Sequence, residues 1–197
     1  MTENNNEDED QIGLDNLEKR YSGCTKCPLS KNRLKFVYGE GNHSADIMII
    51  GEGPGADENI TGRPFIGEAG KLLTKMLAAI NIDRQQVYIC NIVKCRPPQN
   101  RTPLPNEISA CLPYLEQQIR IIKPKVLLLL GKTAINTLLK QDKTIEAYRS
   151  EQPFKYKNMP VWLTFHPSAL LRRPEWKKDA WADLQRFRDY LLENNIK

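Results

Sequence analysis

Three polar residues that lie far apart in the sequence have side chains that together could hydrolyse a bond. Glu52, Asn91 and His166 each come directly after a short apolar run. A carboxylate can orient or deprotonate water, an amide can bind a hydrogen-bonding edge of a substrate, and an imidazole can stabilise a leaving anion. Taken singly, such a histidine is more often structural and such an asparagine more often a turn former. The three residues therefore indicate a site only if the fold brings them together.

The apolar runs predict strands that would place these side chains at one edge of a sheet. We expect strands at 47–50, 87–90, 126–130 and 161–165. Helical periodicity predicts helices at 14–21, 72–80, 106–122, 133–140 and 175–193. The last helix is expected to bury Trp181, Leu184, Phe187 and Leu191, whereas residues 141–158 have no clear assignment. Strands that alternate with helices form a mainly parallel sheet, and its carboxyl ends share one edge. Residues 12–197 are thus predicted to form a single α/β domain.

The first strand runs into a loop rich in glycine and proline at 51–56. This loop fits a relaxed Gly-x-Gly-x-x-Ala dinucleotide fingerprint, but that fingerprint needs a helix that begins at once and an acidic residue about 20 positions later. We expect the next helix only from about residue 67, and the residues around Lys71 are not acidic. A dinucleotide site is therefore disfavoured. A carboxylate at the end of a parallel strand favours a ligand site, with a structural turn as the alternative.

The charge of the chain is unevenly distributed. The net charge is +5, yet residues 1–10 hold five acids and no base, so the remainder carries 29 bases against 19 acids, or +10. A basic surplus indicates a polyanion as partner, although a soluble protein with a basic surface fits equally well. Residues 1–11 are predicted to be disordered and to compete with the polyanionic partner for basic residues at the rim of the predicted sheet. Since the start is acidic and no apolar run is long enough for a bilayer, we expect a cytoplasmic protein without a membrane partner.

Four cysteines have a spacing that could hold metal. Cys24 and Cys27 form a C-x-x-C pair, and Cys95 and Cys111 supply two further thiols. In a reducing compartment, metal ligation or free thiols explain cysteines better than disulfides. Zinc and an iron-sulfur cluster remain equally open, and four unrelated buried thiols are the alternative. Cys90, inside a predicted strand, is expected to be a core thiol.

The segment after His166 combines apolar and basic residues. Exposed leucines beside arginines could wedge into a duplex while the guanidinium groups hold phosphates. The alternative is that the leucines pack on the last helix. The residues concerned are Ala169, Leu170, Leu171, Arg172 and Arg173. A second basic stretch could widen the rim, and its members are Lys94, Arg96 and Arg101.

Four ordered motifs give the chain a resemblance to a known family. They lie at 51–55, 62–67, 91–98 and 166–172, and read GEGPG, GRPFIG, NIVKCRPP and HPSALLR. With the four cysteines, they resemble the family-four uracil-DNA glycosylases, the iron-sulfur type, from Cys24 to the last helix. The resemblance implies a three-layer α/β/α sandwich around a four-stranded, mainly parallel sheet. It also implies a structural 4Fe-4S cluster on Cys24, Cys27, Cys95 and Cys111, which decides the choice that spacing left open.

The resemblance further implies how uracil is recognised after it is flipped out of the DNA. Phe65 would lie under the flipped ring, while Asn91 would donate to O4 and accept from N3–H. Cytosine reverses both polarities at that edge. Since an unsatisfied buried polar group costs about 1 to 3 kcal/mol, two mismatches allow roughly 30-fold to 10⁴-fold rejection. Glu58 is assigned to the wall that excludes the C5 methyl group of thymine.

Cleavage of the N-glycosidic bond leaves negative charge on the uracil and positive character on the sugar. His166 and backbone amides near Gly53 would stabilise the uracil anion. Glu52 would stabilise the sugar and hold the attacking water. The wedge residues 169–172 would bind DNA, which is single- or double-stranded and contains uracil.

One departure from the family concerns Asn59, where relatives commonly have Asp; we expect it to affect loop support. Some relatives instead trap uracil sites covalently through a histidine on an inserted basic loop, but residues 96–101 contain no histidine. A nucleotide-binding accessory protein that releases no base is a further alternative. We expect a monomer, and a sliding clamp or another repair partner stays open.

Overall fold

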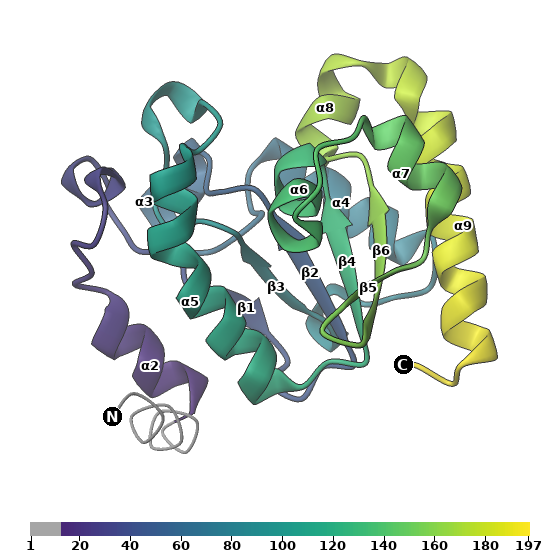
Figure 1. Cartoon of the computed structure of the whole chain (residues 1–197), viewed down its shortest axis with the longest axis horizontal. Helices are drawn as coiled ribbons and strands as arrows, with labels where there is room; N and C mark the ends of the chain where they lie inside the picture. The colour runs from purple at the N-terminus through teal and green to yellow at the C-terminus, as the bar shows by residue number, and fades with distance from the viewer. Residues whose placement is uncertain (1–12) are drawn as a thin grey trace.

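The computed structural model describes residues 13–197, and a six-stranded mixed sheet lies at its centre (Figure 1). The strand order is β1-β3-β2-β4-β6-β5. The strands are β1 (Glu40–Gly41), β2 (Ile47–Gly51), β3 (Tyr88–Asn91), β4 (Val126–Leu130), β5 (Phe154–Tyr156) and β6 (Met159–Thr164). The neighbours β3, β2, β4 and β6 run parallel, and β1 and β5 are antiparallel edges. The predicted number of four strands is therefore wrong, because two-residue and three-residue edge strands carry no apolar run.

Helices cover both faces of the sheet (Figure 1). They are α2 (Leu14–Tyr21), α3 (Ala56–Thr61), α4 (Glu68–Ala78), α5 (Pro105–Ile122), α6 (Lys132–Leu139), α7 (Ile145–Glu151), α8 (Pro167–Arg172) and α9 (Lys177–Glu193). One core contains side chains of α2, α5 and α6, and the other contains side chains of α4, α8 and α9. Along β2, Ile47 and Ile49 belong to one core, and Met48 and Ile50 to the other. Burial on both faces explains why this strand is an unbroken apolar run.

The strand register brings the predicted residues to one edge. Gly51 pairs with Asn91 between β2 and β3, and Leu130 pairs with Thr164 between β4 and β6. The residues that follow these pairs leave the sheet on the side where α6 and α8 lie in Figure 1. Pairing continues briefly beyond the strands, since the Val93 amide donates to the Glu52 carbonyl over 3.1 Å.

Several local predictions need correction. Helix α3 begins at Ala56, directly after the glycine-rich loop, so the premise that no helix opens there was wrong. Four of its six residues are polar and Ile60 is exposed, so no apolar periodicity marks this helix in the sequence. Residues 167–172, expected as a loop, form α8, and part of the unassigned stretch 141–158 forms α7 and β5. Trp181 is 40% exposed, whereas Leu184, Phe187 and Leu191 are buried as predicted.

Two predictions made for the start of the chain, disorder and competition with DNA, fall on residues 1–11, outside the described residues. Within residues 13–197, no helix has both the length and the apolar character needed to cross a membrane.

Candidate active site

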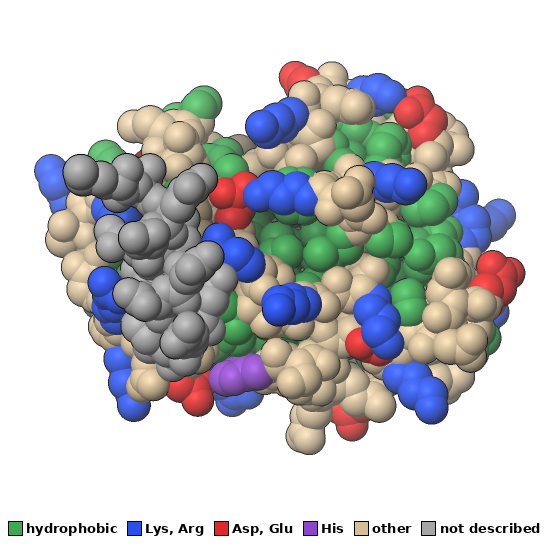
Figure 2. Space-filling view, turned by 60° about the horizontal axis from the view of Figure 1, so that its bottom comes forward, with side chains coloured by type: hydrophobic (Ala, Val, Ile, Leu, Met, Phe, Trp, Pro, Cys, Tyr) green, Lys and Arg blue, Asp and Glu red, His purple; other side chains and the backbone are tan. Residues whose placement is uncertain are grey.

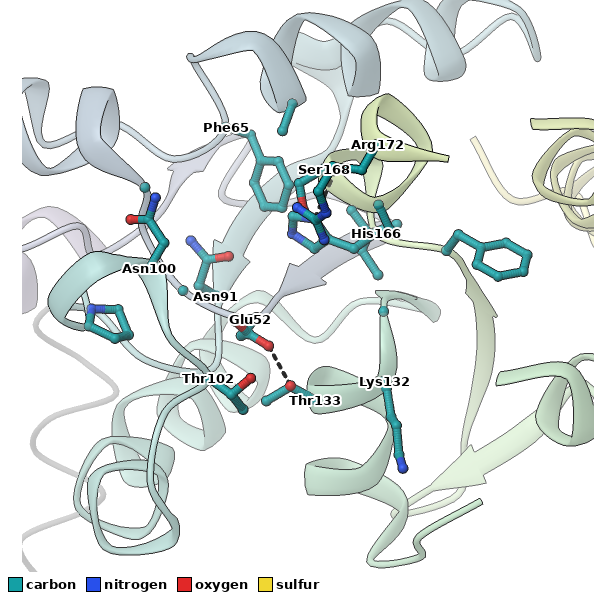
Figure 3. Close-up of a pocket in the computed structure, with 18 of the residues that line it drawn as sticks. Glu52, Phe65, Asn91, Asn100, Thr102, Lys132, Thr133, His166, Ser168 and Arg172 are labelled. Carbon is teal, nitrogen blue, oxygen red and sulfur yellow. Dashed lines mark hydrogen bonds between the residues drawn. The ribbon is translucent and has the colours of Figure 1, made fainter. Parts of the chain in front are cut away.

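A cavity of about 1020 Å³ opens at the carboxyl ends of the parallel strands, and we call it the strand-end cavity (Figure 3). Glu52, Asn91 and His166 all line it. The structure therefore brings together the three residues that the sequence predicted to meet. Gly53, Glu58, Phe65, Ala169 and Arg172 line the same cavity.

Asn91 is the most buried polar group of the strand-end cavity, with 1% of its surface exposed. Its Oδ1 is buried and has no hydrogen-bond partner among the described residues. A Cβ atom at Gly51 would collide with the Phe65 ring and come within 2.6 Å of this oxygen. Glycine at that position thus leaves room for the amide. Because a buried acceptor without a partner costs about 1 to 3 kcal/mol, this oxygen is suited to a donor supplied by a ligand.

Phe65 is held in a strained conformation beside this amide. Its φ is 51°, its side chain is 5% exposed, and its ring centroid lies 5.5 Å from that of His166. A positive φ at a bulky residue costs on the order of 1 to 3 kcal/mol and requires support from its surroundings. The next two backbone amides, of Ile66 and Gly67, both donate to the Glu58 carboxylate over 3.0 Å. The aromatic ring is thereby fixed at the cavity wall.

Glu58 has a supporting role that the sequence did not reveal. Besides these two amides, its carboxylate accepts from the Gly55 amide over 3.0 Å, and its side chain is buried. It therefore links the glycine-rich loop to the segment that carries Phe65. Its predicted part in excluding the thymine methyl group stays a prediction. The neighbouring Asn59 accepts from the Leu34 amide over 2.9 Å, which is a contact of the kind expected for loop support.

His166 is the N-cap residue of α8, and its ring is neutral in this environment. Burial lowers the pKa of His166 to about 4, and the nearby Arg172 contributes further, against an opposing effect of Glu58. Nδ1 accepts from the Ser168 amide over 3.2 Å, and the Ser168 hydroxyl lies 2.8 Å away. A neutral ring that accepts at Nδ1 carries its proton on Nε2. His166 can therefore donate a hydrogen bond from Nε2.

Glu52 lies across the strand-end cavity from the histidine (Figure 3). Burial raises the pKa of Glu52, while a hydrogen bond from the Thr133 hydroxyl and the charge of Arg172 oppose this effect. Thr133, in the first turn of α6, was missed by the sequence analysis. The signal was available, because β4 also ends at this edge and Thr133 follows it by three positions.

Comparison with known proteins agrees with this geometry. A family model of the Uracil DNA glycosylase superfamily matches residues 38–185. The chain is 44% identical over 178 residues to the type-4 uracil-DNA glycosylase of Thermotoga maritima, which covers 89% of this chain and 93% of that protein. It is 41% identical over 187 residues to the type-4 enzyme of Pyrobaculum aerophilum, with the same two coverages, 89% and 93%. The chain belongs to the uracil DNA glycosylase superfamily. The resemblance drawn from the four motifs is therefore confirmed.

The DNA wedge predicted at residues 169–172 of this uracil DNA glycosylase superfamily member is only partly exposed. Leu170 is 2% exposed and packs in the core with α9, whereas Leu171 is 45% exposed. Consecutive side chains of a helix point about 100° apart, and α8 is oriented so that Leu170 faces the core while Leu171 faces outwards. Ala169 and Arg172 line the strand-end cavity, and Arg173 lies 4.8 Å from the Trp176 ring instead.

The second basic stretch does not form the predicted rim. Lys94 is fully buried, and its ammonium group donates to the Asn91 carbonyl over 2.9 Å and to Gln118 over 2.5 Å. Arg101 is paired with the buried Glu107 through two hydrogen bonds of 2.7 and 2.8 Å. Arg96 donates to Asn100 over 2.8 Å. Figure 2 brings a different face forward, on which basic side chains are scattered around a hydrophobic area.

The four predicted metal ligands come from the loop after α2, the loop after β3 and the first half of α5, and we call them the cysteine corner. Cys95 and Cys111 are buried, and Cys24 and Cys27 pack against the same core. Burial raises the pKa of Cys111 to about 12, and the nearby Cys95 and Cys27 thiols add to this effect. Burial also raises the pKa of Cys95, with smaller contributions from Cys27 and Cys24. The thiols are thus close enough to influence one another.

The donor groups around the cysteine corner fit a negatively charged cluster. Arg33 donates to the Cys95 sulfur over 3.5 Å, Tyr114 to the Cys24 sulfur over 3.1 Å, and the Lys94 amide to the Cys111 sulfur over 3.2 Å. Among the described residues, no three His, Cys, Asp or Glu side chains are placed to hold a single metal ion. A cubane cluster is larger and binds each thiolate at a different iron. Cys90 is a fully buried core residue, as predicted.

Proposed function

We propose that this chain is a DNA repair enzyme that hydrolyses the N-glycosidic bond of uracil in DNA, releasing free uracil and leaving an abasic site. The observation that carries the proposal is the unpartnered Asn91 Oδ1, buried in a cavity that also holds a neutral histidine and a carboxylate. Membership of the superfamily and the names of the type-4 relatives support the same activity.

Asn91 reads the base edge in this proposal. Its Oδ1 accepts from uracil N3–H, which satisfies the buried oxygen, and its Nδ2 donates to O4. Cytosine presents an acceptor at N3 and a donor at position 4, so both contacts fail. Phe65 lies under the ring, and Glu58 limits the space at C5 while it holds the Phe65 segment in place.

His166 and Glu52 act on opposite sides of the breaking bond. As the bond breaks, negative charge develops on uracil O2, and the Nε2–H group of His166 donates a hydrogen bond to it. A neutral imidazole suits this role because it donates without transferring its proton to the weakly basic anion. Backbone amides near Gly53 assist at the same edge. The Glu52 carboxylate stabilises the positive sugar and orients the attacking water.

The DNA contacts of this proposal lie on α8. Leu171, which is exposed, enters the base stack in place of the flipped nucleotide. Arg172 and Ala169 lie at the cavity and contact the backbone of the flipped nucleotide. Leu170 keeps α8 attached to the core.

The cysteine corner would hold a 4Fe-4S cluster in this proposal, with Cys24, Cys27, Cys95 and Cys111 as ligands. When bound, the cluster would supply a structural link rather than redox chemistry. Arg33, Tyr114 and the Lys94 amide would stabilise the ligand thiolates. The segment 91–95 would thereby be fixed between the corner and the strand-end cavity. The monomeric state and the cytoplasmic location stay predictions from the sequence.

A base-release assay tests the proposal. The protein is incubated with single-stranded and double-stranded oligonucleotides that contain one uracil, and with matched thymine and cytosine controls. We expect free uracil and an alkali-labile site from the uracil substrates alone. A denaturant-resistant adduct would indicate covalent trapping instead, and DNA binding without base release would indicate an accessory protein; either outcome would overturn the proposal.

A further inference from the structure

The first turn of α6 is held against the catalytic histidine by a glycine. Gly131, the N-cap residue, has a φ of 83°, and its amide donates to the Thr164 carbonyl over 2.9 Å. A Cβ atom at Gly131 would lie 2.8 Å from the His166 Cβ. Only glycine combines this φ with this close approach. The position of α6 relative to His166 is therefore fixed by the backbone.

This fixed turn carries Thr133, whose hydroxyl donates to Glu52 Oε2 (Figure 3). Among the described residues, Thr133 is the only group with a hydrogen bond to the Glu52 carboxylate. Oε1 accepts no hydrogen bond from these residues. The half-buried Thr133 thus connects the loop after β2 to the same turn that packs against His166.

We propose that Thr133 is a positioning residue: its hydroxyl holds the Glu52 carboxylate in the orientation that presents Oε1 to the attacking water, and it favours the ionised form of that carboxylate. The inference rests on the proposed glycosylase function and adds a residue to it. A hydrogen bond from a hydroxyl to an ionised carboxylate is stronger than one to the neutral acid, so its loss favours protonation.

Other charged and titratable groups face the same cavity and must be taken into account. Their side chains come from α3, α4, α6, α7 and α8 and from the segments that precede α5, α7 and α8. The residues are Asp57, Glu58, Glu68, Arg101, Lys132, Asp142, Glu146, His166 and Arg172. Of these, Arg172 is the one whose charge lowers the pKa of Glu52. Arg101 is paired with Glu107, and Lys132 with Asp142 over 2.9 Å. Thr133 and Arg172 are thus the groups that favour the ionised carboxylate.

The test compares Thr133→Val, which keeps the shape and removes the hydroxyl, with Thr133→Ser, which keeps the hydroxyl. Single-turnover uracil release is measured across the acid limb of the pH profile. We expect the limb of Thr133→Val to move up by about one pH unit, with about tenfold slower release below the limb, and Thr133→Ser to stay near the parent. Thr74→Val is the matched control, because the Thr74 hydroxyl bonds within α4 to the Gly70 carbonyl over 3.1 Å.

Glu52→Gln supplies the second half of the test. Adding Thr133→Val to Glu52→Gln should slow release no further, since the hydroxyl acts through the carboxylate. An independent readout is the pKa of Glu52 from carbon-13 NMR of labelled glutamate, assigned by comparison with Glu52→Gln. We expect this pKa to be higher in Thr133→Val than in the parent.

An unchanged acid limb and an unchanged Glu52 pKa in Thr133→Val would overturn the inference, as would equal losses in Thr133→Val and Thr133→Ser. If Thr133→Val does not fold, Thr133→Ala takes its place with the same two outcomes. If the parent protein releases no uracil, the proposed function fails, and the NMR titration alone then decides whether Thr133 controls Glu52.

Discussion

The strand-end cavity and the cysteine corner both gather polar side chains in buried surroundings, but their polar atoms are in opposite states. In the cavity, Asn91 Oδ1 has no hydrogen-bond partner within residues 13–197, and the Glu52 carboxylate has a single one there. In the corner, the sulfurs of Cys24, Cys95 and Cys111 each accept a hydrogen bond. A buried group without a partner is costly and persists where a ligand completes it, whereas groups already partnered contribute to the stability of the fold.

The two regions are connected by the buried Lys94. Its amide donates to the Cys111 sulfur, and its ammonium group donates to the Asn91 carbonyl. The ammonium group also reaches Gln118, whose side-chain amide donates to the Tyr38 carbonyl over 2.9 Å. We therefore expect substitutions in the strand-end cavity to change mainly activity, and substitutions in the cysteine corner to change mainly stability.

The largest effect is expected from Asn91→Asp in the cavity. The substitution places a charged acceptor opposite uracil O4, so release of uracil should fall on the order of 10²-fold in single-turnover assays. The melting temperature should fall as well, because a carboxylate at a position that is 1% exposed is costly to bury, so release is measured well below the unfolding transition. Asn106→Asp, on the exposed start of α5, is the control for the charge change. Unchanged uracil release would remove Asn91 from base recognition.

The corner is tested by Cys95→Ala against Cys90→Ala. Loss of Cys95 should abolish bound iron and the brown colour expected of an iron-sulfur protein. It should also lower the melting temperature by about 10 °C, or about 3 to 5 kcal/mol. Cys90→Ala removes one buried atom from β3 and should cost about 1 kcal/mol while iron is retained. Elemental analysis and thermal unfolding measure both. Zinc in place of iron in the parent protein would contradict the cluster assignment.

The residues that line the strand-end cavity were easier to predict from the sequence than the residues and strands that hold the cavity in place. Convergence of Glu52, Asn91 and His166 was predictable, because apolar runs identify parallel strands and parallel strands share a carboxyl edge. The edge strands β1 and β5 were not predictable, since they are too short to show a pattern. Burial of Lys94 was missed for another reason: a lysine in a basic stretch is normally exposed, and its partner Gln118 comes from a distant part of the chain.

Helix α3 and Glu58 show the same limit. The helix has no apolar periodicity, and Glu58 forms its contacts with backbone amides that only the folded loop brings near. Sequence reasoning could therefore find residues that follow a regular element, and it failed for residues whose role is to hold irregular segments together.

A smaller effect concerns the stability cost of keeping His166 neutral. Its pKa is about 4 in the folded protein against 6.5 for a free side chain, so the unfolded chain binds more protons between these values. Stability should fall as the pH drops below about 6.5 and level off near 4, by up to about 3 kcal/mol. His166→Gln cannot titrate and should lose less stability over this range. Urea unfolding of both proteins at each pH measures the difference, and parallel curves would show that His166 is not held neutral.

The smallest effect is expected on α8, where Leu171 is exposed beside the buried Leu170. Leu171→Ala should reduce uracil release from duplex DNA about fivefold, equivalent to about 1 kcal/mol, because the side chain that fills the emptied base stack is lost. Release from single-stranded DNA and the melting temperature should stay unchanged, since Leu171 does not pack in the core. Leu192→Ala, 70% exposed at the far end of α9, is the matched control. If both leucine variants lose the same activity, or if Leu171→Ala slows both kinds of DNA equally, α8 contacts DNA through Arg172 and the backbone rather than through a wedge.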